Sequence, residues 1–232
     1  MVRNDDPDLQ QNILVGKSPR RYLAGRRSYH RCMMLDSDPD SIDLASFALA
    51  LITSRQTILP KRLTAPGPDA AQARQLFQAA AAAPDHRLVT PWRFVLVPPA
   101  RRDTLAQAFG QALLLRDADA TPEQLAQARA KAFRAPFLAL AIARLGVCQP
   151  DVDPLERMVS VGAAIQNILL CAHSMGFGTS LTSGQAMRAD PLRALLGLAD
   201  GEHAVCCINI GTVSKARPVR LHPDVATFVS SL

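Results

Sequence analysis

The longest apolar pattern of the chain covers residues 153–178 and predicts a helix of roughly six turns, about 33 Å long. An apolar residue recurs at alternating steps of four and three, which places one seam along the helix: Val161, Ile165, Ile168, Ala172 and Met175. The other faces are largely apolar too. We therefore expect the helix to be buried on nearly all sides, by its own domain and by a second subunit.

Both ends of this helix carry sequence signals. Asp153, with Pro154 at the first helical position and Glu156 three residues after the cap, predicts a capping box with a carboxylate cap. Gly176 predicts a left-handed C-cap. Polar residues inside the helix argue against a membrane span, and one of them, His173, is interpreted as a packed helix histidine.

Caps and proline or glycine breaks divide the rest of the chain into shorter elements. The predicted helices are 44–52 behind a Ser41 cap, 72–83 behind an Asp69 cap, 100–116, 121 to about 134 from a Thr121–Gln124 capping box, and 190–197. The predicted strands are 93–97, 137–143, 179–181 and 204–210. The run at 137–143 is apolar throughout, which is typical of a strand buried on both faces. The pattern predicts an α+β fold in one domain, 41–232.

Residues 1–40 lack any sustained period and mix Asp, Pro, Gln and Arg, which predicts a disordered or loosely attached extension. Residues 1–31 hold seven Lys or Arg and three Asp, so +4 of the net charge of +6 lies there. The basic cluster is open to two interpretations: an arm that targets the protein or binds an acidic partner, or an extension without function, with Met33 or Met34 as the true start. We favour the second.

Composition narrows the function classes. The remaining charge of +2 does not favour a nucleic-acid surface. The five cysteines show no CxxC and no metal-ligand spacing, so we expect no metal site and a reducing, cytoplasmic location. No signal peptide and no membrane span is expected.

Three loops carry residues suited to binding a ligand. Arg55-Gln56-Thr57 offers a planar cation and a hydroxyl, which suit an oxyanion such as phosphate. His86, after Pro84-Asp85, is a candidate donor or general acid. Residues 176–184 combine glycines with hydroxyls and permit close approach of a flat ligand. Each loop also has a structural explanation: Arg55 at a helix C-terminus, His86 in a turn, and Gly176 as a C-cap.

The order of these loops around the long helix resembles the FMN-dependent nitroreductases, in particular their short, minimal branch. The matching pieces are S-R-Q-T at 54–57, A-A-P-D-H at 82–86, P-W-R-F at 91–94, R-A-P at 134–136, the stretch 160–178, T-S-G at 182–184 and I-G-T at 210–212. They follow one another in the family's order over most of the chain from 41 to 210.

The resemblance implies a nitroreductase-like fold, with a mostly antiparallel central sheet flanked by helices around the long buried helix, whose seam faces its copy. It further implies a homodimer that holds two FMN molecules at the subunit interface. NAD(P)H then reduces the flavin, and a small acceptor such as a nitroaromatic or quinone takes the electrons by a ping-pong route. No side chain is needed as nucleophile or base, and no catalytic residue is assigned.

Carried over by position, the resemblance assigns FMN contacts in three groups: Arg55, Gln56 and Thr57 at the phosphate and ribityl end, Ala82 and His86 from the partner chain, and Leu181, Thr182 and Ser183 beside the flavin ring. The basic residues Lys215, Arg217 and Arg220 are further candidates near the phosphate.

The chain departs from the branch's pattern at three places. A second Arg is replaced by Gln56, a basic residue by Ala82, and Trp-Arg by Leu181-Thr182. Lys61, Arg62, Arg87 and Arg93 lie on the same loops and are candidate substitutes. The departures support an alternative function, a dimeric binding protein of this fold that has lost tight FMN or turnover.

Overall fold

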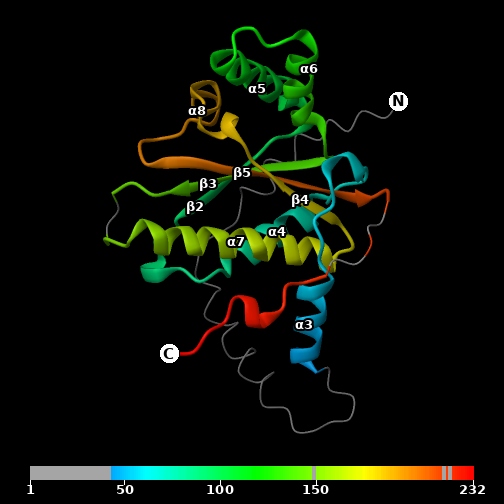
Figure 1. Cartoon of the computed structure of the whole chain (residues 1–232), viewed down its shortest axis with the longest axis vertical. Helices are drawn as coiled ribbons and strands as arrows, with labels where there is room; N and C mark the ends of the chain where they lie inside the picture. Colours follow the sequence, from blue (N-terminus) through cyan, green and yellow to red (C-terminus); the bar gives the residue numbers. More distant parts are fainter. Residues whose placement is uncertain (1–42, 148–149, 216–217, 219–220) are drawn as a thin grey trace.

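The computed structural model describes residues 43–147, 150–215, 218 and 221–232 (Figure 1). The Ser41 cap and the whole predicted extension, residues 1–40, lie outside these residues, as do Arg217 and Arg220. The first described helix, α3 (Leu44–Ser54), is capped by Asp43, whose carboxylate accepts a hydrogen bond from the Ala45 N–H.

A five-stranded sheet forms the centre of the molecule, with strand order β1-β5-β3-β2 and β4 paired to β5. The strands are β1 (Leu63–Thr64), β2 (Trp92–Leu96), β3 (Phe137–Arg144), β4 (Gly178–Thr182) and β5 (Glu202–Val213). Every pair of named strands is antiparallel, which confirms the expected kind of sheet. The strand β1 lies in a stretch that the sequence predicts to be a loop. A strand of two residues is too short to show a hydrophobic period, so the pattern does not reveal it.

Helices cover both faces of the sheet (Figure 1). One layer holds α4 (Ala70–Ala81) and α7 (Pro154–Ser174); the other holds α5 (Arg102–Arg116), α6 (Pro122–Ala130) and α8 (Asp190–Leu196). Side chains of β3 alternate between the two layers: Ala139 and Ala141 belong to the α4/α7 core, and Leu138 and Leu140 to the α5/α8 core. The strand is therefore buried on both faces, as its apolar run predicts.

The apolar seam of the long helix α7 is expected to face a second copy of the chain, but in the structure it faces the chain's own core. Val161, Ile165, Ile168 and Ala172 are buried in the core shared with α4 and the sheet of the same chain, rather than facing a copy. The opposite face exposes Leu155 and Val159 to 78% and 73%. Among the described residues, α7 is the one helix long and apolar enough to cross a membrane, and packing against its own sheet accounts for that composition.

The caps of α7 match the sequence in part. Asp153 accepts a hydrogen bond from the Leu155 N–H at 2.7 Å, but Glu156 does not complete a capping box because its carboxylate binds His86 instead. Gly176 has a φ of 84° and donates to the His173 carbonyl, as a left-handed C-cap requires. The helix predicted from Thr121 to about Arg134 ends earlier, at Ala130, and a 3₁₀ turn (Lys131–Phe133) follows.

Candidate functional site

Three elements meet where α3 ends. The loop after α3 lies beside the start of β4, because the Ile58 N–H donates to the Thr179 carbonyl at 2.8 Å and Thr57 forms a bridge with Thr179. The C-terminal end of α7 reaches the same point, where Ser54 Oγ and His173 Nε2 are hydrogen-bonded at 2.9 Å. Sequence segments more than 100 residues apart therefore converge around Arg55.

Arg55 is a cation without a partner at this junction. Its Nε is buried and makes no hydrogen bond, and Arg55 forms no hydrogen bond or ion pair with another described residue. Burial and the nearby charge of Arg55 lower the pKa of His173 below its usual value, so the neighbouring ring does not add a second cation at neutral pH. A half-buried guanidinium with an unmet donor is suited to an anionic ligand.

β4 leads from this junction to the predicted segment Leu181–Ser183. About 3.3 Å per residue places Ser183 roughly 13 Å from Thr179 along the strand. Leu181 is exposed, whereas the Thr182 hydroxyl accepts a hydrogen bond from Asn209 Nδ2 at 3.0 Å and the Ser183 hydroxyl donates to the Val205 carbonyl at 2.9 Å. Both hydroxyls are thus bound within the chain, and the exposed surface here comes from Leu181 and the backbone.

His86 lies away from this junction in the same chain. Ala82 caps α4, and His86 Nδ1 binds Glu156 Oε2 at 2.7 Å in the first turn of α7. Glu156 and His173 are 17 residues apart on α7, about 26 Å at 1.5 Å per residue. One chain therefore brings together Arg55, Gln56, Thr57 and the 181–183 segment along β4, but not His86.

The loop that carries His86 has an unusual backbone. Arg87, Leu88 and Thr90 have φ values of 58°, 54° and 46°, a region that β-branched residues such as threonine rarely adopt. The Asp85 carboxylate holds the loop by accepting the Thr90 N–H at 2.8 Å. Strain of this kind persists where the surroundings fix it, and it is often associated with a functional segment.

The basic residues proposed to replace the missing cations differ in whether they are free to bind a ligand. Arg93 is already bound to Glu202 on the α8 side of the sheet. Its Nε donates to Glu202 Oε1 at 2.8 Å and its Nη2 donates to Glu202 Oε2 at 2.7 Å. Lys61 and Arg62 lie in the 3₁₀ turn Pro60–Arg62, and Ser214 donates to the Arg62 carbonyl, which brings Lys215 close to them. The sequence places these residues on or beside neighbouring loops but does not show that Arg93, in β2, is bound by Glu202.

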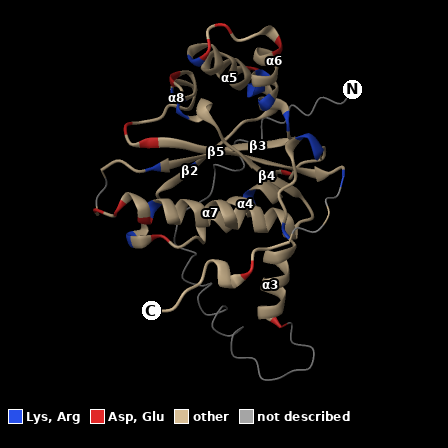
Figure 2. Ribbon diagram, in the orientation of Figure 1, with Lys and Arg blue, Asp and Glu red and all other residues tan. Residues whose placement is uncertain are grey.

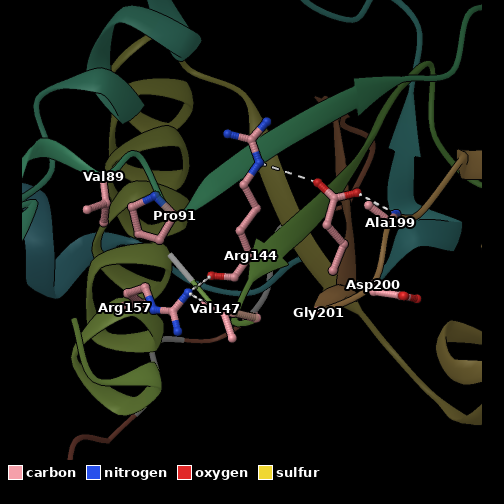
Figure 3. A pocket seen from close by; sticks show the side chains of 10 residues that line it. Val89, Pro91, Arg144, Val147, Arg157, Ala199, Asp200 and Gly201 are labelled. Atoms are coloured by element: carbon pink, nitrogen blue, oxygen red, sulfur yellow. Dashed lines mark hydrogen bonds and ion pairs between the residues drawn. The ribbon is translucent and has the colours of Figure 1, made fainter. Parts of the chain in front are cut away.

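A polar network that no sequence pattern indicates lies around a small cavity of about 280 Å³ (Figure 3). Glu202 accepts hydrogen bonds from Arg93, Arg144 and the Ala199 N–H. Arg157, only 4% exposed, donates to the carbonyls of residues 144–146. These partners lie up to 109 residues apart in the sequence, so no local motif reveals the network.

Glu202→Gln is expected to destabilise the fold by up to about 3 kcal/mol at neutral pH. The hydrogen bond and charge of Arg93 lower the pKa of Glu202 from 4.5 to about 2. A lowered folded-state pKa stabilises the protein above pH 4.5, and this contribution is lost as the pH falls from 4.5 through 2. Urea unfolding at a series of pH values should show the difference from wild type shrinking in that window.

The control for this prediction is Asp119→Asn, which removes an exposed carboxylate and should change stability by less than about 0.5 kcal/mol. A Glu202→Gln difference that is constant from pH 7 to pH 2 would contradict the ionic role of Glu202.

Fold and site together define an α+β domain with two helical layers around an antiparallel sheet, in which Arg55 has no partner among the described residues. The Nitroreductase family model matches residues 52–212, and the chain belongs to this family. This confirms the family resemblance seen in the sequence.

Individual relatives agree with this assignment. The chain is 31% identical over 186 residues to a protein of Haemophilus influenzae named "Putative NAD(P)H nitroreductase", covering 80% of this chain and 99% of that protein. Among solved structures, the nitroreductase-like family protein from Bacillus cereus has a TM-score of 0.67 at 20% identity, over 79% of this chain and 95% of that one. The NADPH:FMN oxidoreductase from Vibrio harveyi complexed with NAD+ has a TM-score of 0.59 at 20% identity, over 79% and 76%.

Proposed function

We propose that the protein is an FMN-dependent NAD(P)H oxidoreductase that passes electrons from a nicotinamide to a small acceptor such as a nitroaromatic or a quinone. The observation that carries the proposal is the unpaired, partly buried guanidinium of Arg55 at the junction of α3, α7 and β4. Family membership and the relatives' names, which include NAD(P)H and FMN, support the same reaction class.

The residues along β4 fit FMN in length and chemistry. Arg55, Gln56 and Thr57 would bind the phosphate and ribityl end, and the exposed segment Leu181–Ser183, roughly 13 Å away, would lie beside the ring system. When bound, FMN supplies the hydride and electron transfer, so the side chains bind and orient it and exclude solvent. This division agrees with the absence of an assigned catalytic residue.

A homodimer would complete this site. His86 lies at the end of α7 opposite Arg55, so two copies related by a two-fold axis, with their α7 helices antiparallel, would place the His86 loop of one near the Arg55 junction of the other.

Exposed apolar surface supports the same assembly. No residue of α3 is buried, although the helix is apolar. It carries no charged residue (Figure 2), and it exposes Leu44, Phe47, Leu49 and Ile52. The C-terminal segment, which contacts α3 through His222 and the Thr53 carbonyl, exposes Leu221, Val225, Phe228 and Val229. Apolar patches of this extent usually mark a protein interface.

The alternative is a dimeric binding protein of this fold without tight FMN or turnover. Gln56, Ala82 and Thr182 supply no charge, and Arg93 is engaged by Glu202, so Arg55 carries more of the phosphate binding than it would with neighbouring cations. Each lost charge-assisted hydrogen bond lowers affinity by about 1.5–3 kcal/mol.

Flavin content distinguishes the two functions. The enzyme is expected to be yellow when purified, to release FMN on heat denaturation and to bleach anaerobically on addition of NADH or NADPH. Protein that stays colourless after incubation with excess FMN would contradict the enzyme proposal, and flavin-loaded protein that NAD(P)H does not bleach would favour the binding protein. Deleting residues 1–32 should leave flavin content unchanged.

A further inference from the structure

A second, larger cavity of about 1130 Å³ opens beside the segment assigned to the flavin ring. Ser183 and Gly184 line one side of it, directly after β4 ends. Its other walls come from the C-terminal end of α5, the turn and helix 185–196, the start of β5, and Leu145 and Met158 in the α7 layer. The cavity therefore continues from the proposed flavin position into the α5/α8 layer.

The lining of this cavity is divided into an apolar part and a cationic part. Leu115, Leu145, Met158 and Val205 provide apolar surface that suits a flat, uncharged ring. Arg116, Arg188 and Arg193 provide three cations from three different elements, and Asp190 is the one acidic residue among the described residues that line the cavity. The arginines are thus in excess over the carboxylate. Figure 2 marks basic residues in blue on the α5 and α8 layer.

Two of these arginines bind no other group among the described residues. Arg193 donates to the Glu202 carbonyl at 3.3 Å, but Arg116 and Arg188 form no hydrogen bond or ion pair with another described residue, and both are exposed. Arg116 lies in the last turn of α5, where the negative end of the helix dipole stabilises a positive charge. That effect does not account for Arg188, which lies outside a long helix and lines the same cavity.

We propose that this cavity is a substrate subsite that binds the anionic group, a phosphate or a carboxylate, of a molecule whose flat ring lies beside Leu181–Ser183. The inference rests on the proposed function and specifies its substrate class. Arg116 and Arg188 bind the anion through several planar donors, and the apolar wall packs against the uncharged body. The anion has two possible sources: the phosphates of the nicotinamide nucleotide, or a carboxylate on the electron acceptor.

Steady-state kinetics of the Arg116→Gln/Arg188→Gln double variant tests the proposal. The reductants are NADPH and NADH. The acceptors are 4-nitrobenzoate, which carries a carboxylate, and nitrobenzene, which is uncharged. We expect kcat/KM for the charged substrate to fall on the order of tenfold or more, and kcat/KM for nitrobenzene at saturating reductant to keep its wild-type value. Added salt should lower kcat/KM for the charged substrate more in wild type than in the variant.

The matched control is Arg101→Gln, which removes an exposed arginine outside the cavity and should alter none of these values. A loss with NADPH but not NADH identifies the 2′-phosphate as the anion, and an equal loss with both reductants identifies the diphosphate that they share. A selective loss with 4-nitrobenzoate identifies the acceptor carboxylate. Equal effects on charged and uncharged substrates, or no effect on any of them, would overturn the proposal while leaving the flavin enzyme intact.

A wild-type protein without flavin would contradict the proposed function separately from this inference. Equilibrium dialysis with NADPH and with 4-nitrobenzoate then tests the subsite directly. Binding to wild type that is weakened about tenfold or more in the double variant supports the subsite. Equal binding to both proteins, or no binding to wild type, refutes it.

Discussion

Replacing Arg55 by alanine is expected to lower the affinity for FMN by roughly tenfold to 150-fold. The loss of one charge-assisted hydrogen bond to a phosphate costs about 1.5–3 kcal/mol, and each 1.4 kcal/mol is a factor of ten in Kd. Since the neighbouring positions are Gln56 and Thr57, no adjacent cation replaces the lost charge. Titration of flavin-free protein with FMN, followed by quenching of flavin fluorescence, measures the change.

Riboflavin makes this experiment specific for the phosphate. It carries the same ring and ribityl chain without the phosphate, so wild type and Arg55→Ala should bind riboflavin with nearly equal affinity. Arg55→Lys should give an intermediate affinity for FMN, because lysine keeps the charge but loses the planar set of donors. Equal FMN affinity of wild type and Arg55→Ala would refute the phosphate role, and a matching loss for riboflavin would assign Arg55 to another part of the ligand.

The flavin-free protein should respond in the opposite direction. The buried Arg55 Nε has no hydrogen-bond partner, and an unsatisfied buried donor costs free energy in the folded state. Arg55→Ala is therefore expected to leave the free energy of unfolding of the flavin-free protein unchanged or slightly higher. Binding residues often show this opposition between stability and ligand affinity. A large loss of stability would indicate a structural role instead.

Much of the fold is visible in the sequence because its signals are local. The Asp69 and Thr121 capping boxes, the Gly197 C-cap and the apolar run of β3 all appear where the pattern predicts them. The capping box at Asp153 fails for a physical reason, since Glu156 reaches His86, a partner 70 residues away that no local pattern shows. Tertiary contacts of this kind override a local preference.

The candidate site was accessible from the sequence only in part. The order of the loops indicated the family, but sequence order carries no distance, so the sequence alone does not show that β4 connects Arg55 to Ser183 or that α7 separates His86 from Arg55. The Glu202 network and the arginines of the larger cavity also come together through the sheet topology, and each arginine alone resembles an ordinary surface residue.

Aspartate substitutions on the two faces of α7 are expected to have different consequences. Ile168 is 1% exposed in the core with α4 and the sheet, so Ile168→Asp places an unpaired charge in an apolar interior. The cost of several kcal/mol is a large part of the 5–15 kcal/mol that typically stabilises a domain. We expect Ile168→Asp to lose cooperative thermal unfolding in circular dichroism and to accumulate as insoluble protein.

Val159 lies on the same helix but is 73% exposed in the single chain, so Val159→Asp should leave the fold of the chain intact. If the outer face of α7 packs against a second copy, the charge is instead buried between subunits, and light scattering should show a larger monomer fraction than in wild type. Val159→Thr is the matched control of similar shape and should stay dimeric. A folded, flavin-loaded Ile168→Asp protein would contradict the placement of the seam in the core. A fully dimeric Val159→Asp protein would place the interface elsewhere, on α3 and the C-terminal segment alone.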